Sequence, residues 1–523
     1  MGLPSLDRLF GRSGSERTPP RASESSPLLT HDNEDGANAR GNAIAVPVSD
    51  GTGATATAAD QPQQLRYPTP NNGGGGDGDH HGSATTTCIA TGSTDAMAAY
   101  AALFQDEGSG YALKLAAAMY CFAVLGMFVS TTGVILSSVQ ADPSYSGGGR
   151  MSDTQVSLLF LAAPVGYLAA AQLNRRVHVR YGRRGVAVAG PCLHIAMAAV
   201  VALHPPSFPV VVGAWVVGSL GHGIVDGSVC AWAGDLEGAS AASGMLHGAY
   251  SAGAGLGPFL AGTLISYKGQ ERWYEWFYVL AAASILELLI MTFAFRADDA
   301  KSYRKHINNH NNTIAPLLSE SDPGSRTSTR YRSVVGICAS FLLVYVGTEA
   351  LVTGWIVAYM ERVRHLSLYA ASLCSTAFGL GMATGRLVLG LVTERFGVRR
   401  AVPVYIVGAI LLDVLFALSP MSESSATPAI VLIALVGFCL GPLFPSAIVL
   451  LVQLLPRHLH VRAVSVVALV GQVGAALLPF GLGVMAEVIG IQLLPLVVFV
   501  CLAVMLVLWG WFARPSVRQA ASQ

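Results

Sequence analysis

Long apolar stretches recur along this chain from about residue 113 to residue 513, separated by short polar segments. About 20 consecutive apolar residues suffice for a helix to cross the hydrocarbon core of a bilayer. The stretches do not alternate apolar and polar residues with the period of two that a β-barrel strand requires. The pattern predicts twelve membrane helices, near 113–138, 152–174, 185–204, 208–233, 241–266, 275–296, 332–360, 367–393, 400–419, 428–455, 461–488 and 490–513.

Polar segments flank and divide these stretches. The first of them is rich in Gly, Ser, Thr, Asp, Asn and Pro, a composition that buries too little apolar area to offset the entropy of ordering. We therefore expect a disordered cytoplasmic tail over 1–110, a six-helix half over 111–296, a cytoplasmic linker loop over 297–331, a second six-helix half over 332–513 and a cytoplasmic tail over 514–523.

Lys and Arg in the short loops indicate the orientation, because basic loops are retained on the cytoplasmic side. The segments NRRVHVRYGRRG, TERFGVRR and LPRHLHVR all lie on one side if both termini are cytoplasmic, and HPPSFP and SPMSESSATP on the other side have no Lys or Arg. Two loops, ERVRHLS and GDLEGAS, go against this assignment. The balance favours an integral membrane protein with both termini in the cytoplasm.

The two groups of six helices resemble each other in sequence. VRYGRRGV at 179–186 resembles TERFGVRR at 393–400, at an offset near 215, and GAGLGPFLAG at 253–262 aligns with GAALLPFGLG at 474–483, at an offset of 221. Two halves in the same orientation form a parallel repeat. The expected fold is an all-α polytopic membrane protein with twelve transmembrane helices in two parallel six-helix repeats.

Composition agrees with this class and excludes others. The chain is 52% hydrophobic and 12% charged, about half the charged fraction of a typical soluble protein. Its net charge of +1 gives no reason to expect a nucleic-acid partner. The eight cysteines show no CxxC or zinc-type spacing, so we expect no metal and no cofactor. GxxxxGK[ST] and HExxH are absent, so we expect no enzyme activity and no ATP-driven transport.

The loop between the eighth and ninth predicted helices resembles a signature of the major facilitator superfamily. GLVTERFGVRR fits that signature of Gly, three residues, an acid, Arg, any residue, Gly and basic residues, and the matching positions are Gly390, Glu394, Arg395, Gly397, Arg399 and Arg400. The first-half loop keeps Arg180, Gly182 and Arg183 but has Val179 where the acid would stand. The resemblance implies the superfamily's fold and a gating role for these loops, with the acid of the signature present in the second-half loop alone.

Helices 4, 5 and 7 look closest to the group of the bacterial fucose–proton symporter and its fungal relatives. GHGIVDGSVCAWAGDLEGASAASGMLHGAYSAGAGLGPFLAG and YVGTEALVTGWIVAYM carry this likeness. The bacterial symporter has a functional carboxylate in helix 4, and Asp226 stands at the matching place. It has another in helix 1, where this chain has no acid. The sugar specificity and the coupling scheme therefore do not simply carry over.

Small residues in helix 5 fit the superfamily's antiporter pattern, with Ala261 replacing one glycine. They are Gly244, Gly253, Gly257, Pro258 and Gly262. Small residues also let helices approach closely, which explains the same pattern without any transport role. Both interpretations stay open, and with them the direction of transport.

Ionisable residues inside the apolar stretches are candidates for function, because a charge there costs about 3 kcal/mol and usually faces a cavity. Asp226 and His247 each lie roughly 10 Å from the cytoplasmic helix ends, so they would pair if their faces converge. His222 lies one turn above Asp226. Glu349 lies in helix 7 near Gly354. We expect proton coupling at Asp226, His222, His247 and Glu349, with a static hydrogen-bonded cluster as the alternative at the first three.

Other polar side chains have a functional and a structural interpretation. Trp355 offers a flat apolar face and one N–H donor to a solute, or serves as a packing anchor. Gln453 and Gln472 would bond a solute or a neighbouring helix. We expect structural roles for Glu287, Asp413 and His194, and a gate or loop-anchoring contact for Arg386.

The tail segment ESSPLL fits an acidic dileucine sorting signal formed by Glu24, Leu28 and Leu29. It would recruit a sorting adaptor and direct the protein to a vacuolar or lysosome-like membrane, with the plasma membrane as the alternative. The expected function is secondary active transport of small organic solutes, sugar-like solutes among them, by a monomer in the lipid bilayer that works by alternating access and is coupled to protons. The alternatives are a proton-driven efflux antiporter and a transporter-like receptor that moves nothing.

Overall fold

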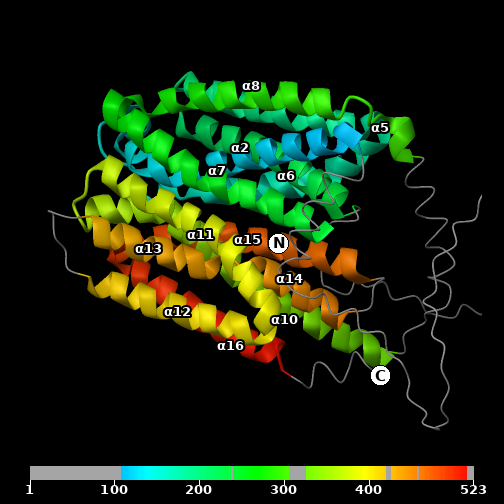
Figure 1. Cartoon of the computed structure of the whole chain (residues 1–523). Helices are drawn as coiled ribbons and strands as arrows, with labels where there is room; N and C mark the ends of the chain where they lie inside the picture. Colours follow the sequence, from blue (N-terminus) through cyan, green and yellow to red (C-terminus); the bar gives the residue numbers. More distant parts are fainter. Residues whose placement is uncertain are drawn as a thin grey trace, which may run out of the picture. The chain divides into compact units, whose positions relative to one another are not determined.

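The computed structural model describes residues 108–234, 236, 239–304, 325–419, 426–455 and 459–514, which form helices joined by turns, with no β-strand among them. The longer helices run side by side (Figure 1). They are α2 (Gly108–Ala141), α5 (Leu158–Ala202), α6 (Phe208–Gly234), α7 (Ala239–Lys268), α8 (Trp276–Ala294), α10 (Ser325–Arg362), α11 (Leu368–Phe396), α12 (Val398–Leu418), α13 (Thr427–Leu440), α14 (Leu443–Leu454), α15 (His460–Val488) and α16 (Leu494–Phe512). Four short elements complete the described chain: α3 (Pro143–Ser146), α4 (Asp153–Val156), η2 (Gln270–Glu275) and η4 (Ile491–Leu493).

All twelve predicted apolar segments fall on these helices, and the all-α polytopic fold is confirmed. Among the described residues, ten helices are long and apolar enough to cross a membrane. The number of candidate spans is smaller than the twelve predicted helices for two reasons. The second and third predicted segments fall within one candidate span, Asp153–Ala202, in which α5 turns at the non-helical Gly182 and so contains two helices. Helix α7 is 30 residues long, but its many Gly, Ala and Ser residues keep its hydropathy below that of the ten spans.

The tails and part of the linker lie outside the described residues. Within the predicted linker, residues 297–304 are described, and α10 already begins at Ser325. We call the end of the bundle that carries residues 142–157 and 269–275 the outer end, following the orientation predicted from the sequence. The inner end carries the two loops that resemble each other.

A glycine makes the turn between two helices in each of these inner loops. Gly182 has a φ of 72° and Gly397 a φ of 80°. Both values lie in the left-handed region, which glycine enters without the steric cost that a β-carbon imposes. The two glycines occupy matching places in RYGRRG and RFGVRR. The sequence repeat is therefore also a repeat of backbone conformation.

A second pair of matched glycines sets the distance between helices. A β-carbon on Gly253 of α7 would overlap the carbonyl group of Ala123 in α2, and one on Gly474 of α15 would overlap the carbonyl group of Leu343 in α10. Gly253 and Gly474 are matched by the same offset of 221 that aligns their segments. Helix α2 thus packs on α7 as α10 packs on α15, which is the geometry of a parallel repeat.

Neighbours in the bundle are often not neighbours in sequence. In the first half α5 packs on α6 and α8, and in the second half α11 packs on α13. Contacts between the halves join α2 to α10, α7 to α11 and α5 to α15. The consecutive helices α6 and α7 touch each other far less than either touches its main partner.

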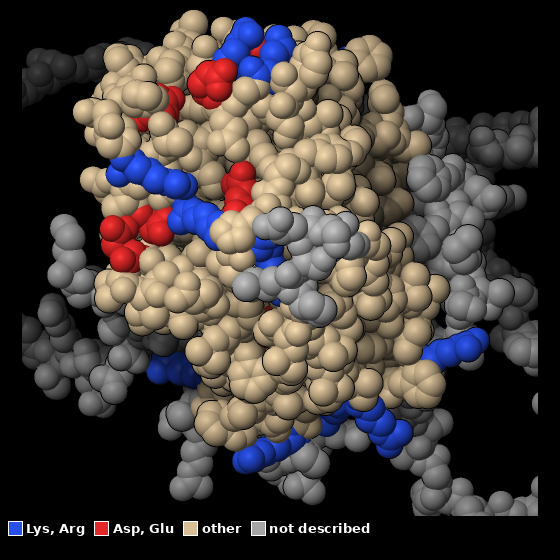
Figure 2. Space-filling view, turned by 90° about the vertical axis from the view of Figure 1, so that its left-hand side faces the viewer, with Lys and Arg blue, Asp and Glu red and all other residues tan. Residues whose placement is uncertain are grey.

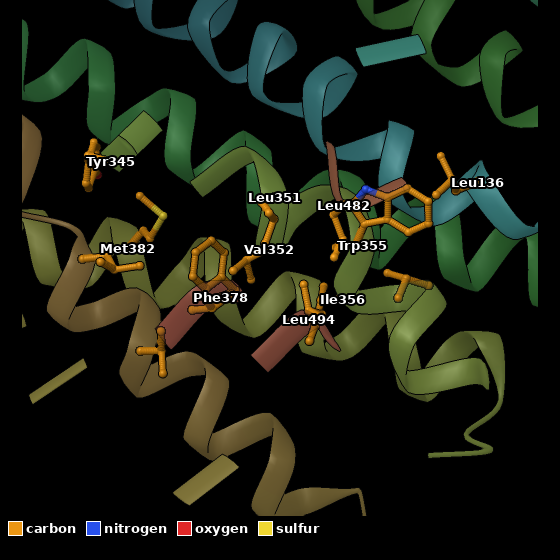
Figure 3. Packing of buried hydrophobic residues seen from close by; sticks show 14 of the residues in the cluster. Leu136, Tyr345, Leu351, Val352, Trp355, Ile356, Phe378, Met382, Leu482 and Leu494 are labelled. Carbon is orange, nitrogen blue, oxygen red and sulfur yellow. The ribbon is translucent and has the colours of Figure 1, made fainter. Parts of the chain in front are cut away.

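A buried apolar cluster joins the two halves. It includes Leu136 of α2, Trp355 of α10, Phe378 of α11 and Leu482 of α15, and Figure 3 shows these side chains within it. Because lipid is as apolar as these side chains, close van der Waals packing holds such helices together, rather than removal of apolar surface from water.

Candidate functional site

An ion pair lies inside the second half, between α10 and α11. Arg386 Nη2 is 3.6 Å from Glu349 Oε1, and the two side chains are 12% and 18% exposed. An isolated charge at this depth would be costly, and the opposite charge compensates it. Glu349 was predicted as a cavity carboxylate, whereas its basic partner was not predicted.

Arg386 also bonds to backbone that the sequence leaves without a helical partner. Its Nε donates to the carbonyl oxygen of Gly441, 3.3 Å away, between α13 and α14. In a continuous helix that oxygen would accept from the residue four positions on, but this residue is Pro445, which has no N–H. The break in the tenth predicted helix therefore supplies a ligand for Arg386.

The same guanidinium reaches across to the first half. Arg386 Nη1 donates to the carbonyl oxygen of His247, 3.0 Å away in α7, and to the hydroxyl of Ser251. The Ser251 hydroxyl in turn donates to the same His247 oxygen at 3.0 Å. Arg386 thus joins Glu349 in one half to α7 in the other, where the sequence led us to expect a gate or loop-anchoring contact.

The predicted Asp226–His247 pair is not formed between these two described residues. Asp226 is half-buried in α6, and its Oδ1 accepts from Cys230 Sγ at 3.3 Å. The His247 ring lies against Phe122 and Phe444, with centroid separations of 5.9 and 5.8 Å. The physical reason is that α6 packs on α5 while α7 packs on α2 and α11, so the hairpin does not bring the two faces together.

His222 is buried and turns toward α5. Its ring centroid lies 4.7 Å from that of His194 and 5.6 Å from that of Phe128. His194 was expected to be a packing residue and Glu287 a structural acid, and the two form a buried pair with Nδ1 3.0 Å from Oε2. Sequence reasoning missed this pair, although both residues lie near the middle of their predicted helices, a depth match that would have suggested it.

The three residues that were predicted to contact the solute differ in how buried they are and in what they bind. Trp355 is fully buried, and its indole N–H already donates to the carbonyl oxygen of Pro479 in α15, 2.9 Å away. Gln453 is exposed and Gln472 is half-buried. Within the described part of the chain, neither glutamine hydrogen-bonds to another side chain, so both amides are free to bind solute or solvent.

The predicted gate loops lie at the inner end. Arg180 stacks over Tyr181, 5.5 Å from its ring centroid, and Glu394 and Arg395 are both exposed. Gly390 is half-buried, and Arg399 and Arg400 follow in the first turn of α12.

The first-half loop lacks the acid of the signature and is held by other groups. The N–H of Arg184 donates to the carbonyl oxygen of Asp298 at 3.0 Å. Lys114 pairs with the Asp298 carboxylate at 2.7 Å. A β-carbon on Gly182 would overlap the backbone of Asp298 and Asp299, so glycine is required here by close approach as well as by φ. The segment after α8 thus anchors the loop.

The small-residue motif of helix 5 is accounted for by packing. Besides Gly253, a β-carbon on Gly257 would come within 3.0 Å of Met127 in α2, and one on Gly262 would overlap Ser372 in α11. Pro258 lies inside α7 between them. Three glycines therefore let α7 approach one helix of its own half and one of the other half, and the direction of transport stays open. Gly244 lies on the same helix near its start and is exposed.

Polar side chains join the two halves at the outer end, which the sequence did not predict. Arg362 of α10 pairs with Asp153 of α4 at 2.7 Å and also bonds to Gln140. The N–H of Asp153 donates to Glu487 Oε2 at 2.7 Å. Gln270 bonds to Glu361 at 3.3 Å. Basic and acidic side chains lie close together on this face (Figure 2).

A hydrogen-bonded carboxylate stabilises the outer loops of the first half. Asp142 Oδ2 accepts from the indole N–H of Trp273 at 2.9 Å and pairs with His204 Nε2 at 2.8 Å. Burial by itself would raise the pKa of the Asp142 carboxyl, but the hydrogen bonds from Trp273, His204 and Ser144 outweigh it and hold the pKa below its ordinary value. The three loops are joined through one ionised group.

The sorting signal predicted at Glu24, Leu28 and Leu29 lies outside the described residues. No group of three or more His, Cys, Asp or Glu side chains that could hold a metal ion occurs within the described part of the chain.

Solved transporter structures share this fold. The structure of a D-xylose–proton symporter matches with a TM-score of 0.56 at 15% identity, over 76% of this chain and 97% of that chain. The nucleoside transporter NupG matches with a TM-score of 0.53 at 12% identity, over 77% of this chain and 98% of that chain. Likeness at such low identity establishes the fold, and leaves the solute open.

Sequence comparison gives the family. Bypass of stop codon protein 6 of Saccharomyces cerevisiae is 28% identical over 421 residues, which cover 77% of this chain and 82% of that protein. The family model described as Major Facilitator Superfamily matches residues 116–372 and 337–523. Together these two stretches cover residues 116–523, well over half of the chain, and the chain belongs to the major facilitator superfamily of membrane transporters.

Proposed function

We propose that this protein moves a small organic solute across its membrane by alternating access and that protons drive the movement. The observation that carries the proposal is the buried Glu349–Arg386 pair, because its guanidinium also bonds to α7 of the opposite half. A titratable carboxylate is thereby connected to the contact between the halves.

Protonation of Glu349 would act directly on that contact. The ionised carboxylate attracts Arg386, and adding a proton removes most of that attraction. Arg386 then redistributes among its other acceptors, the carbonyl oxygens of His247 and Gly441. A change of one proton at Glu349 would thus alter how tightly α11 is held against α7, which is the kind of bistable contact that alternating access needs.

The polar contacts between the halves support the same mechanism. In the described part of the chain, those at the outer end join Asp153, Gln140 and Gln270 of the first half to Arg362, Glu361 and Glu487 of the second. Deeper in the bundle, Arg386 also joins the halves. The group of polar contacts at the outer end is the arrangement expected for a state that is closed toward the outer side.

The solute class is proposed from the chemistry of the site and from the similar structures. The described interior offers the half-buried amide of Gln472, the guanidinium of Arg386 and the carboxylate of Glu349, which together bind polar, hydroxyl-rich molecules well. A D-xylose–proton symporter is among the solved structures that share this fold, and we propose a sugar-like solute and a proton as the coupling ion. Asp226, half-buried in α6, is the proposed first-half carboxylate that faces the same pathway.

A flux measurement tests this proposal. The purified protein is reconstituted in vesicles, and uptake of labelled sugars, nucleosides and small organic acids is measured with and without an acidic exterior. We expect one class to be taken up, faster with the pH gradient, and this acceleration to be lost in Asp226→Asn. The control is Asp413→Asn, which removes a buried acid of α12 that has no ion pair among the described residues. Uptake that ignores the gradient in the wild-type protein would refute proton coupling.

A further inference from the structure

Three ionisable side chains meet inside the first half, on helices other than those of Glu349 and Arg386. His194 of α5 places Nδ1 3.0 Å from Oε2 of Glu287 in α8, and both side chains are fully buried. His222 of α6 lies beside His194, with ring centroids 4.7 Å apart. We call these three residues the His–Glu cluster.

Both oxygens of the Glu287 carboxylate have a hydrogen-bond partner, whereas each of the two imidazole rings has a nitrogen without one. Glu287 Oε1 accepts from Cys121 Sγ of α2 at 2.8 Å, and Oε2 interacts with His194. Nε2 of His194 and Nε2 of His222 are both buried and have no hydrogen-bond partner in the protein. Buried polar atoms are nearly always partnered, so two such nitrogens on adjacent rings point to a role beyond packing.

The groups that face the cluster supply no other positive charge. From α2 come Cys121, whose thiol donates to Glu287, and Tyr120, whose hydroxyl donates to the carbonyl oxygen of Ala283 in α8 at 3.2 Å. From α6 comes Asp226, one helical turn from His222. Among the described residues no Lys or Arg pairs with Glu287. His194 is therefore the basic group available to compensate the buried carboxylate.

Proton counting shows what the cluster can hold. With Nδ1–H donated to the Glu287 carboxylate, a neutral His194 leaves a net charge of −1 inside the bundle. One proton added to the lone pair on His194 Nε2 makes the pair neutral overall, and no other bond forms or breaks. A buried charge is costly unless it is paired, so the cluster gains by taking that proton. The His222 ring, with its own Nε2, lies next to the acceptor.

We propose that the His–Glu cluster is a proton-binding site of the first half, with His194 Nε2 as the acceptor and the adjacent His222 ring as the group that brings the proton from water and stabilises it once it is bound. The proposal rests on the proton-driven transport proposed above and adds a second site to the one at Glu349. Loading the site changes the electrostatic attraction that holds α5 to α8, beside the face of α6 that carries Asp226.

A purely structural role predicts a different behaviour. If the cluster only holds helices together, replacing His222 changes little, because this side chain makes no hydrogen bond to the described part of the protein. If it binds a proton, the same replacement changes the response to pH. His222→Gln therefore separates the two roles without breaking a bond that the fold uses.

The first measurement needs no solute. Acid-minus-neutral infrared difference spectra are recorded on the purified, reconstituted protein for the wild type, Glu287→Gln and His222→Gln. We expect the wild-type spectrum to contain an imidazole protonation signal that Glu287→Gln loses and His222→Gln weakens. The control is His178→Gln, because buried His178 has both ring nitrogens partnered, by the Asn174 carbonyl at 2.9 Å and the Ser228 hydroxyl at 2.8 Å.

The second measurement is the pH profile of solute uptake. A step that requires one bound proton changes by up to about tenfold per pH unit, and we expect less than about twofold in His222→Gln. The proposal is overturned if His222→Gln and Glu287→Gln keep the wild-type spectrum, or if His178→Gln loses the signal equally. An intact infrared signal in a protein that moves no solute would instead refute the proposed transport and leave the proton site standing.

Discussion

The outer-end contact between Asp153 and Arg362 is expected to set how often the two halves separate at that end. Asp153 Oδ1 accepts from Arg362 Nη1 at 2.7 Å and from Gln140 Nε2 at 2.6 Å. The Arg362 and Asp153 side chains are 22% and 14% exposed, so solvent screens this pair only in part. Asp153→Asn keeps the size and one acceptor oxygen but removes the charge.

The magnitude follows from the change in hydrogen-bond type. A hydrogen bond to a charged group contributes roughly 1.5–3 kcal/mol and a neutral one roughly 0.5–1.5 kcal/mol, so the substitution costs the closed state about 1 kcal/mol. Since 1.4 kcal/mol corresponds to a factor of ten, the ratio of open to closed outer ends rises about fivefold.

The assay is a distance measurement between nitroxide labels at two exposed positions, Ser144 in the first half and Gln492 in the second. We expect the long-distance population to grow about fivefold in Asp153→Asn. Glu275→Gln is the matched control, because Glu275 pairs with Lys268 and Arg272 of its own half. An unchanged distribution in Asp153→Asn, or an equal change in the control, would refute the reasoning.

Three further predictions concern stability and solute binding. Trp355→Phe loses the indole bond to the α15 carbonyl and should lower the free energy of unfolding by roughly 0.5–1.5 kcal/mol while leaving the KM for solute unchanged; a raised KM would make Trp355 a solute contact. Gly253→Ala and Gly474→Ala should each cost about 1–3 kcal/mol in thermal unfolding through overpacking, whereas Gly481→Ala, which meets open space, should cost nothing, and equal effects at all three would contradict the packing. Because the pKa of Asp142 is lowered in the folded protein, the ionised carboxylate stabilises the fold at neutral pH, and this stabilisation is lost as the pH falls below about 4. In thermal unfolding measured against pH, Asp142→Asn should remove the corresponding fall in unfolding temperature at acid pH.

The helices and the parallel repeat could be predicted from the sequence because both depend on local or repeated patterns. Apolar run length defines a span, and the glycines at 182 and 397 mark the same turn twice. The sorting motif lies outside the described residues and stays a prediction. So does the finer likeness to the fucose–proton symporter group.

Side-chain partners across helices could not be predicted in the same way. The Asp226–His247 pairing assumed that a hairpin brings its two helices together, whereas α6 and α7 each pack mainly on other helices. Arg386 of α11 pairs with Glu349 because α11 packs on α10, and it donates to the Gly441 carbonyl oxygen because this oxygen lies at the break between α13 and α14. Such contacts depend on helix rotation and neighbour order, which the hydrophobic pattern of a nearly all-apolar helix does not specify.

The central claim is that a proton at Glu349 drives solute movement. The most direct test is the steady-state accumulation of the transported solute in vesicles under an imposed pH gradient, compared between the wild type and Glu349→Gln. For one proton per solute, the wild type should accumulate solute up to about tenfold per pH unit, because one unit is worth about 1.4 kcal/mol. Glu349→Gln should exchange labelled for unlabelled solute but show equal concentrations on both sides. Accumulation at the wild-type level in Glu349→Gln would contradict the claim.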